Sequence, residues 1–354
     1  MQQTNEIFFD KIETVFNSNF PFIVFRKPNE NKVTALCQKT NELFELKSFD
    51  QSGFIFAPFN KNGLKIIFPL EKCDVLITNL DNDFELNEKS TVLKSTTKDN
   101  AQVNHISIIE KAVEFIKSNK AKKIVLSRKE TLESDTIDVI YTLKQMLNNY
   151  KNAFVYVWFH PKIGLWMGAT PERLISISEN KLKTMSLAGT QKFKGTLDVI
   201  WQEKELHEQR YVTDYIVENI KPKLTSFKTV GPYTVQAGSL LHLRTDISGT
   251  LKSSNLLETL INSLHPTPAI CGIPKKVATD FILEHEGYNR AYYSGYLGEL
   301  NMNNSTNLFV NLRCMQLENN SASIFVGGGI TCKSIAENEW VETVSKAEIM
   351  RKVL

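Results

Sequence analysis

The sequence predicts an α+β protein, an α/β sandwich in which large and mostly antiparallel sheets are flanked by helices. Pairs of short apolar runs joined by turn residues recur along the chain, and segments with a helical period of apolar residues lie between them. The chain has 354 residues, of which 42% are hydrophobic, so it can bury a large core. Hairpins separated by helices favour antiparallel sheets over a parallel βαβ arrangement.

The N-terminal part of the chain is predicted to be rich in strands. Residues 20–37 form a hairpin pattern, because Pro28 and the asparagines around it interrupt two apolar runs. Further short strands are expected at 53–59 and 64–70, and the polar stretch 79–104 is expected to be a surface connection. We therefore expect a β-rich segment, residues 1–100, that completes the core of a catalytic region, residues 101–354, within one integrated domain.

Helices and strand pairs alternate in the rest of the chain. Apolar residues at helical spacing predict helices at 105–120, 135–150, 201–220 and 337–346, and Gly272 and Pro274 precede one more. Apolar or alternating runs predict strands at 122–130, 153–160, 163–169, 292–300, 306–317 and 322–330, with a hairpin at 173–189.

Charge and composition narrow the functional classes. The net charge is +3, from 42 basic and 39 acidic residues, and no basic tract is interleaved with aromatic residues, so we expect no nucleic-acid or membrane partner. The first residues lack the basic and apolar regions of a signal peptide, and no apolar run reaches the roughly 20 residues of a membrane span. Five scattered cysteines without a CxxC pair predict reduced thiols in a cytoplasmic protein.

Two segments carry carboxylates three residues apart on a predicted helix. Glu339 and Glu342 precede Lys346 in the last helix, and Glu205 and Glu208 repeat the spacing in the helix 201–220. Each pair by itself is typical of a solvated helix face. Two such helices that meet across a pocket could instead hold a hard divalent cation.

An acid and a base are suggested by two further motifs. Lys123 opens the apolar strand "KKIVLSR"; there it either extends to the surface or points into a closed pocket, where loss of water would favour the neutral amine and a general base. Glu172 follows the tight bend of "GATPERL" and is either an exposed turn residue or a carboxyl in an apolar pocket, which would stay protonated as a general acid.

Two glycine-containing stretches could bind an anion through their backbone. Accessible amides are expected at Gly189 and Thr190 in "SLAGT" and from Gly327 to Gly329 in "IFVGGGIT". A turn or bulge is the alternative for each. Neither stretch is a nucleotide P-loop, because no GK[ST] follows.

Two polar residues interrupt apolar runs. His242 in "LHLRT" is expected to be a core histidine or a ligand contact, and Arg313 in "VNLRC" is expected to lie within a strand. A buried guanidinium requires an anionic partner, which is either a bound carboxylate or a structural ion pair. The prolines of "HPTPAICGIPKK" (265–276) predict a rigid loop.

Taken in order, these motifs resemble one family. The series "KKIVLSR", "GATPERL", "SLAGT", "EKELHEQ", "LHLRT", "HPTPAICGIPKK", "RAYYSG", "VNLRC", "VGGGIT" and "EWVETVSK" is similar to the chorismate-utilising enzymes (the anthranilate synthase component I-like group), and specifically to isochorismate synthases. The resemblance runs from about residue 105 to 350, and residues 1–100 carry no comparable signature. It implies one deep site enclosed by the sheets and helices.

The resemblance implies a Mg²⁺-dependent isomerase. Lys123 would be the general base that takes a proton from water attacking C2 of chorismate, and Glu172 would be the general acid for the hydroxyl leaving C4. The metal ligands would be Glu208 and Glu342, with Glu205 and Glu339 acting through water and Lys346 offsetting their charge. The implied contacts to chorismate are the amides of Gly189 and Thr190 for the ring carboxylate; Arg313, Tyr293, Gly327 and Gly329 for the enolpyruvyl carboxylate; and His242 and Ala269 near the ring.

Short differences separate the relatives. Ala188 stands where aminodeoxychorismate synthases carry a lysine, and the loop 265–276 differs from that of anthranilate synthases, which need an amidotransferase partner. Salicylate synthases, which also expel pyruvate, tend to carry threonine in place of Ala269, so salicylate synthase is the alternative activity. A non-catalytic chorismate-binding protein is a further alternative. We expect a monomer without an amidotransferase subunit, and menaquinone or siderophore biosynthesis as the pathway.

Overall fold

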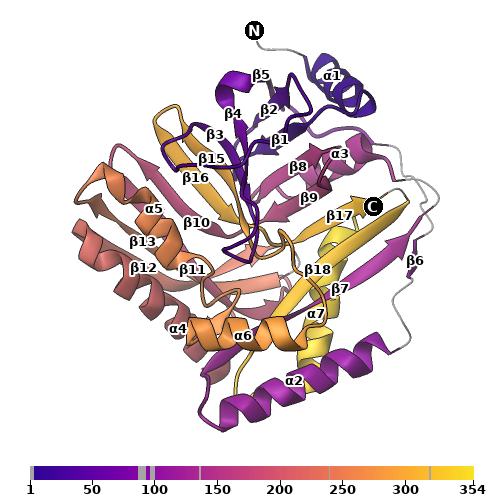
Figure 1. Cartoon of the computed structure of the whole chain (residues 1–354). Coiled ribbons are helices and arrows are strands. Elements are labelled where there is room, and N and C mark those ends of the chain that lie inside the picture. Colours follow the sequence, from indigo (N-terminus) through magenta and orange to yellow (C-terminus); the bar gives the residue numbers. More distant parts are fainter. Residues whose placement is uncertain (1–3, 87–92, 96–99, 135–136, 239, 319) are drawn as a thin grey trace.

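The computed structural model describes residues 4–86, 93–95, 100–134, 137–238, 240–318 and 320–354. Within these residues the chain forms a ten-stranded and an eight-stranded sheet, and every recorded strand pairing is antiparallel. Figure 1 shows the two sheets side by side in a sandwich with helices around them. The prediction of an α+β fold with large antiparallel sheets is confirmed.

The larger sheet has the strand order β14-β7-β18-β17-β9-β8-β1-β2-β5, with β6 paired to β7. Its strands are β1 (Phe22–Arg26), β2 (Lys32–Gln38), β5 (Cys73–Asn79), β6 (Lys94–Ser95), β7 (Lys123–Glu133), β8 (Phe154–His160), β9 (Gly164–Thr170), β14 (Gly272–Ile273), β17 (Cys314–Glu318) and β18 (Ser321–Ile330).

The smaller sheet has the order β12-β13-β11-β10-β16-β15-β3-β4. Its strands are β3 (Gly53–Ala57), β4 (Ile66–Pro69), β10 (Arg173–Ser178), β11 (Lys181–Lys192), β12 (Leu224–Ala237), β13 (Leu240–Leu251), β15 (Tyr296–Met302) and β16 (Ser305–Val310). The N-terminal strands are therefore divided between the two sheets.

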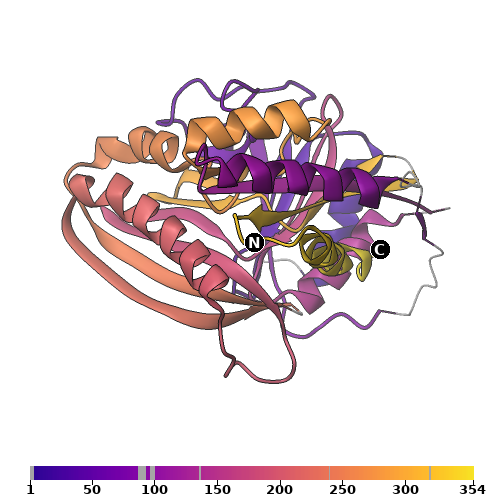
Figure 2. The same ribbon diagram turned by 90° about the horizontal axis from the view of Figure 1, so that it is seen from below.

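Helices cover the outer faces of both sheets. They are α1 (Asn5–Asn17), α2 (Ala101–Lys117), α3 (Val139–Asn149), α4 (Glu203–Ile220), α5 (Leu257–Leu264), α6 (Lys275–His285) and α7 (Ala336–Arg351), with short 3₁₀ turns η1 (Leu70–Lys72), η2 (Lys221–Lys223) and η3 (Ser254–Leu256). Figure 2 shows α2 alongside α6 and α7, and the Phe115 and Phe281 rings pack at 5.0 Å between α2 and α6. None of the described helices combines the length and apolar character needed to cross a bilayer.

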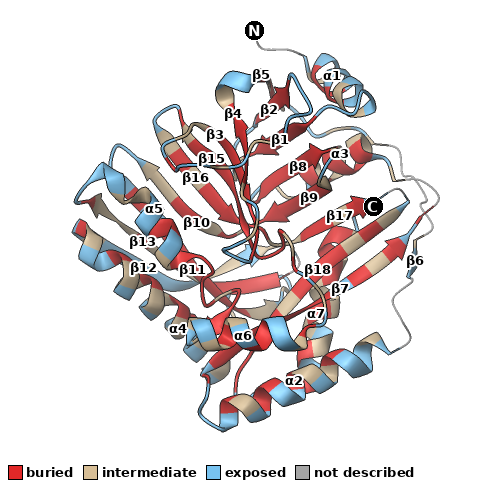
Figure 3. Ribbon diagram, viewed as in Figure 1, coloured by how far each residue is buried: buried red, intermediate tan, exposed pale blue. Residues whose placement is uncertain are grey.

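An aromatic layer joins the two sheets. Phe56 of the smaller sheet lies 4.7 Å from Trp158 of the larger sheet, measured between ring centroids, and stacks on Tyr292 at 4.2 Å. Trp166 stacks on Phe325 at 5.2 Å. These side chains are almost fully buried, and Figure 3 shows the same burial along the central strands. Because alternate strand residues point to opposite faces, the other face of each sheet is left to pack against helices.

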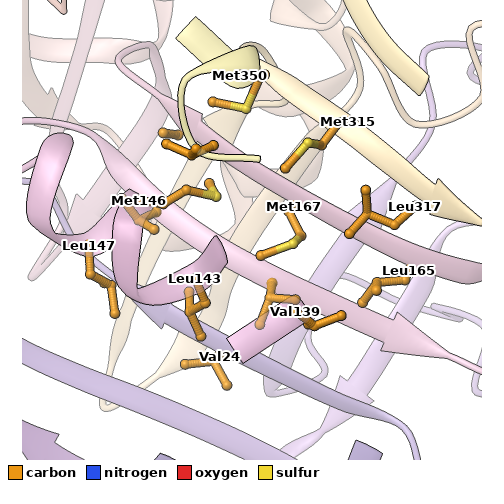
Figure 4. Packing of buried hydrophobic residues seen from close by; sticks show 14 of the residues in the cluster. Val24, Val139, Leu143, Met146, Leu147, Leu165, Met167, Met315, Leu317 and Met350 are labelled. Atoms are coloured by element: carbon orange, nitrogen blue, oxygen red, sulfur yellow. The ribbon is translucent and has the colours of Figure 1, made fainter. Parts of the chain in front are cut away.

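The outer face of the larger sheet packs against α1, α3 and α7. Figure 4 shows Leu143, Met146 and Leu147 of α3 over Met167 of β9 and near Met350 of α7. The smaller sheet packs against α4 and α5 through a separate apolar cluster. A third cluster joins Ile124 and Leu126 of β7 to α2 and α6. Since side chains alternate along β7, Lys123 and Val125 point to the opposite side of that strand.

Two of the connections that pass between the sheets are neighbours in space. Pro171 and Glu172 connect β9 of the larger sheet to β10 of the smaller sheet, and residues 311–313 connect β16 of the smaller sheet back to β17 of the larger sheet. The Val310 N–H donates to the Glu172 carbonyl at 2.9 Å, so the two connections lie against each other. The prediction of one strand over 306–317 is wrong, because the chain changes sheets in the middle of that apolar run.

Other expectations are corrected in part. The expected strand 292–300 begins only at Tyr296, after a turn that includes Ser294 with φ 59°. The helix expected at 105–120 begins earlier, at Ala101, and part of the expected connection 79–104 lies outside the described residues. Helix α1 and the long hairpin of β12 and β13 were not among the predicted elements.

Candidate active site

A cavity of about 710 Å³, open to solvent on one side, lies among β11, β18, α4, α7 and the two inter-sheet connections. The candidate residues that line it are Glu172, Gly189, Thr190, Glu208, His242, Ala269, Tyr293, Arg313, Gly327, Gly329, Glu342 and Lys346. Lys123, Glu205 and Glu339 lie next to the cavity and do not form its surface.

The "SLAGT" stretch forms a bulge in the pairing of β11 with β13. Ala188 faces Leu243 and Gln191 faces Leu241, so Gly189 and Thr190 together oppose His242. Gly189 has φ 73°, a conformation that glycine adopts without strain. The bulge interrupts the β11–β13 hydrogen-bond ladder where Gly189 and Thr190 line the cavity. This is consistent with the prediction that the amides of these two residues are accessible.

His242 is held as a neutral imidazole between the bulge and Arg313. Its Nδ1 lies 2.8 Å from the Gly189 carbonyl, and its Nε2 lies 3.3 Å from Arg313 Nη2. A guanidinium only donates and a carbonyl only accepts, so Nδ1 carries the proton and Nε2 accepts. Burial, followed by the charges of Arg313 and Lys346, lowers the pKa of His242 to about 3. This histidine is therefore a fixed hydrogen-bonding group at neutral pH.

Arg313 is half-buried, and no carboxylate pairs with it among the residues that the structure describes. It lies in the connection between β16 and β17 with φ 49°, so the prediction of a strand position is wrong. Its Nη1 atom is buried and has no hydrogen-bond partner, and burial lowers its pKa. A buried guanidinium N–H without an acceptor is costly, because it has lost its hydrogen bond to water. The position favours a bound carboxylate over a structural ion pair.

The glycines of β18 provide an open strand edge. Strand β7 pairs with β18 as far as Ile330, whereas β17 pairs with it only as far as Phe325. The Gly327 carbonyl accepts a hydrogen bond from Lys346 Nζ at 2.8 Å, so the backbone groups of Gly327 point away from β7. By the alternation of an antiparallel ladder, those of Gly329 do as well. Tyr293 lies beside them: a Cβ on Gly327 would come within 2.9 Å of its hydroxyl oxygen.

Glu172 is a buried carboxyl on the other inter-sheet connection. Only 4% of the residue is exposed. Burial raises the pKa of Glu172 to about 7, against the opposing effect of the Lys123, Arg313 and Lys346 charges. A carboxyl with this pKa holds its proton in much of the population near neutrality, as a general acid requires.

Lys123 forms an ion pair with Glu208 behind the glycine edge. Its Nζ lies 2.8 Å from Glu208 Oε1, an ion-pair distance although the angles are not those of a hydrogen bond. The Lys123 side chain is 0% exposed, and a Cβ on Gly329 would lie 2.9 Å from its Cε. Glu208 thus lies between this amine and the cavity.

The two helices with paired acids meet at the cavity. A Cβ on Gly328 would lie 3.6 Å from Glu339 Oε2 and 3.7 Å from Glu342 Oε1, while a Cβ on Gly329 would lie 2.3 Å from Glu208 Oε1. Glu339 and Glu342 therefore lie near Gly328, and Glu208 lies near the adjacent Gly329. They come from α4 and α7, as the spacing of the acids suggested.

Each of these carboxylates has a lysine partner. Lys346 Nζ lies 2.6 Å from Glu342 Oε1, and Lys204 Nζ lies 2.5 Å from Glu339 Oε1. Burial alone would raise the pKa of Glu342, but the bond to Lys346 outweighs it and the pKa is lowered. Burial and the Glu342 charge raise the pKa of Glu339 despite Lys204. Glu205 differs, because its carboxylate accepts from the Gln202 N–H at 3.2 Å in the capping box of α4.

The acids fit a hard divalent cation by chemistry. Among the described residues, no three His, Cys, Asp or Glu side chains are arranged as a metal cluster. The lysine pairs explain this arrangement, since each carboxylate is turned toward an ammonium group. Carboxylate oxygens on facing helices are the donor set that Mg²⁺ prefers. The glycines, which carry no side chain, leave room between them.

Lys204 is a site residue that the sequence interpretation missed. It follows Glu203 and precedes Glu208 by one helical turn, a spacing that puts it on the same face as the predicted ligand. That signal was present in "EKELHEQ", but the lysine looked like part of a solvated charge run. Leu312 and Phe325 line the cavity and form part of its apolar wall. The sequence interpretation also missed these two residues, because an apolar side chain does not by itself indicate a binding site.

The chain is similar to known proteins over most of its length. The chorismate binding enzyme family matches residues 66–354. Isochorismate synthase MenF of Bacillus subtilis is 29% identical over 283 residues, which cover 77% of this chain and 59% of that protein. The salicylate biosynthesis isochorismate synthase of Pseudomonas aeruginosa is 28% identical over 259 residues, which cover 70% and 53%. The chain thus spans between half and three fifths of the length of these two relatives.

A solved structure supports the fold assignment. The putative 2,3-dihydroxybenzoate-specific isochorismate synthase DhbC of Bacillus anthracis superposes with a TM-score of 0.82 at 22% identity, covering 98% of this chain and 99% of that one. At this identity the likeness concerns the fold alone. The family predicted from the ordered motifs is confirmed by the family match.

Proposed function

The chain belongs to the chorismate binding enzyme family, and from this premise we propose that it is an isochorismate synthase, an isomerase that converts chorismate to isochorismate. The observation that carries the proposal is the pair of inter-sheet connections. They bring to one cavity a protonatable buried carboxyl, Glu172, and the Arg313 guanidinium, whose Nη1 has no hydrogen-bond partner. An acid beside a carboxylate-binding group suits loss of a hydroxyl from an anionic substrate.

Chorismate is a dianion, and the cavity offers two kinds of anion contact. Arg313, oriented by His242, would bind the enolpyruvyl carboxylate together with Tyr293 and the open amides at Gly327 and Gly329. Guanidinium and carboxylate match in two parallel hydrogen bonds. The amides of the bulge at Gly189 and Thr190 would contact the ring carboxylate. Ala269, at the cavity wall, leaves room beside the ring.

The isomerisation exchanges one hydroxyl for another. Water adds to C2 of the ring, and the proton that it loses passes to Lys123. The ring double bonds shift, and the C4–O bond breaks as Glu172 donates its proton, so the hydroxyl leaves as water. The burial of Glu172 and its raised pKa support the acid role. Lys123 accepts this proton as a neutral amine, so its ammonium group must first lose a proton and the Glu208 carboxylate that pairs with it must move away.

Mg²⁺ is the proposed cofactor. Glu208 and Glu342 would hold it directly, and Glu205 and Glu339 through water. When bound, the ion supplies positive charge that neutralises and anchors the ring carboxylate. Lys346 is held by both Glu342 and the Gly327 carbonyl, so it would remain beside the acids and offset their charge.

We further propose that the enzyme works as a monomer without an amidotransferase, because its nucleophile is water and no ammonia has to be supplied. Menaquinone or siderophore biosynthesis stays a prediction for the pathway that consumes the product.

One assay tests the activity. Purified protein with chorismate and Mg²⁺ is expected to form isochorismate, identified by chromatography, with no pyruvate in a coupled lactate dehydrogenase assay. Salicylate with an equal amount of pyruvate would assign the salicylate synthase activity instead. Saturable chorismate binding without product would show a non-catalytic protein, and both results would overturn the proposal.

A further inference from the structure

Lys204 lies at the solvent side of the acid cluster. It is the second residue of α4, its side chain is 23% exposed, and its Nζ bonds Glu339 Oε1 at 2.5 Å. Glu339 itself is only 2% exposed. Both residues line an opening between the first turn of α4 and α7, and the same opening reaches Glu342, which also lines the main cavity. The opening therefore runs from solvent to the proposed metal ligands past Lys204.

The three lysines of the acid cluster are held to different degrees. Lys123 is 0% exposed on β7, and Lys346 is fixed twice, by Glu342 one turn earlier in its helix and by the Gly327 carbonyl. Within the described part of the chain, Lys204 has a hydrogen bond to Glu339 alone. It is also the most exposed of the three, with 23% against 0% and 14%. A long side chain with one bond and access to water can move at small cost.

The positions of the charges around Lys204 indicate what its ammonium group does for Glu339. Glu339 and Glu342 lie one helical turn apart and both carboxylates reach Gly328, so their like charges repel. An uncompensated carboxylate at 2% exposure would be strongly unfavourable. A divalent cation between the helices would supply the same compensation. Lys204 and the ion then compete for one carboxylate.

We propose that Lys204 is a positioning residue, a counter-ion that holds Glu339 in the metal-free protein and yields it to the entering divalent cation. This inference rests on the proposed magnesium site and adds a residue to it. Breaking the Lys204–Glu339 ion pair reduces the net free energy gained when Mg²⁺ binds, so the site binds Mg²⁺ weakly without substrate. The lysine thereby keeps the two acid-bearing helices together while the metal is absent.

The test uses Lys204→Met with Lys333→Met as the matched control. Lys333 lines the same opening and pairs with the exposed Glu203, but it does not contact the buried acids. Calorimetry with Mg²⁺ alone is expected to give an affinity about tenfold higher for Lys204→Met than for wild type, since one neighbouring positive charge is removed. In EDTA its Tm is expected to fall, and Mg²⁺ is expected to raise its Tm more than that of wild type. Lys333→Met should match wild type in both measurements.

A double-mutant cycle separates competition for Glu339 from a general effect of charge. In a Glu339→Gln background, Lys204→Met is expected to change the Mg²⁺ affinity less than about twofold, because the contested carboxylate is gone. An equal gain in both backgrounds would overturn the proposal, as would an unchanged or lower affinity in folded Lys204→Met. Lys204→Gln repeats the measurement with a polar side chain if the methionine variant does not fold.

These measurements use no chorismate. A wild-type protein that makes no isochorismate but shows the expected Mg²⁺ affinities would overturn the proposed activity and support the role of Lys204. A protein that makes isochorismate, but in which the effects of Lys204→Met and Glu339→Gln on Mg²⁺ affinity are additive, would support the proposed activity and overturn the role of Lys204.

Discussion

The ammonium nitrogen of Lys123 lies 2.8 Å from the Glu208 carboxylate, so the proposed base and a proposed metal ligand are each other's partners in the metal-free protein. The Glu208 carboxylate cannot pair with Lys123 and bind a metal ion equally well at the same time. A cation that engages Glu208 would therefore also free Lys123 to face the substrate. This arrangement links assembly of the metal site to exposure of the amine, and it gives the first prediction.

Lys123→Ala is expected to lower kcat by about 10²- to 10⁴-fold, the usual contribution of a positioned general base. Chorismate binding should change little, because Arg313 and the backbone amides remain. Steady-state kinetics and calorimetry with chorismate measure the two effects. Lys122→Ala, at the neighbouring position outside the cavity, is the control. Normal turnover in folded Lys123→Ala would remove the base assignment.

Activity is expected to depend on the proton of Glu172. The pKa of this carboxyl is raised to about 7, so its acid form is lost as the pH rises through 7. The value of kcat/KM should therefore fall on the alkaline side of pH 7. Glu172→Gln should lower kcat by about 10²- to 10⁴-fold and remove this part of the pH profile. Glu133→Gln, on the exposed end of β7, should keep the wild-type profile.

The same carboxyl should affect stability. Its pKa is about 7 in the folded protein against 4.5 when exposed, so the folded state keeps the proton to higher pH. Its contribution to stability is complete below pH 4.5 and is lost as the pH rises through 7. The change is at most about 3 kcal/mol, at 1.36 kcal/mol for each pKa unit. Urea unfolding of wild type and Glu172→Gln between pH 4.5 and 8 measures it; a pH-independent difference between them would contradict the assigned pKa.

Arg313→Lys is expected to raise KM for chorismate by about tenfold to a hundredfold, although the charge is kept. A lysine cannot form two parallel hydrogen bonds to a carboxylate, and it cannot keep the contact to His242 in the same geometry. The control is Arg244→Lys, because Arg244 pairs with Asp246 on the partly exposed β13. A KM within twofold of wild type would exclude Arg313 as the carboxylate anchor.

Glu342→Ala is expected to weaken Mg²⁺ and chorismate binding together. Its loss removes one proposed ligand and leaves Lys346 without its carboxylate partner. Activity titrated with Mg²⁺, and calorimetry of chorismate at fixed Mg²⁺, report the two affinities. Glu348→Ala in the same helix removes only the pair with Arg351 and serves as control. An unchanged Mg²⁺ response would contradict the role of the last helix in metal binding.

Much of the fold could be predicted because local patterns agreed with it. The hairpin of 20–37 and the strands of 153–169 combine apolar runs with turn residues, and both form as expected. The break at residues 311–313 was missed because no glycine or proline marks it. Apolar residues lie on both sides of Asn311 and Arg313, because the chain leaves one buried sheet and enters another, so these two polar residues did not end the predicted strand. The change of sheet is set by tertiary packing and has no local signal.

The long hairpin of β12 and β13 was not predicted, because β12 has too few apolar residues. Most of β12 is exposed, so its sequence lacks an apolar run. Helix α1 did carry a signal, because Phe8, Phe9 and Ile12 are spaced for one buried face after the capping Thr4. In the site, acid pairs on two helices predicted their meeting. The partner of Glu339 could not be predicted, because ion pairing depends on the angle at which α4 and α7 meet.

The aromatic layer between the sheets affects the positions of residues that it does not contact directly. Glu172, the proposed proton donor, and Arg313 sit on two neighbouring crossings between the same two sheets, so the packing of that layer affects how both crossings are held. Phe56 and Trp158 do not line the cavity, and trimming either side chain would let the sheets move closer together or slide. A substitution inside the sandwich would therefore shift Glu172 and Arg313, and with them the proposed activity, while every side chain that lines the cavity stayed the same.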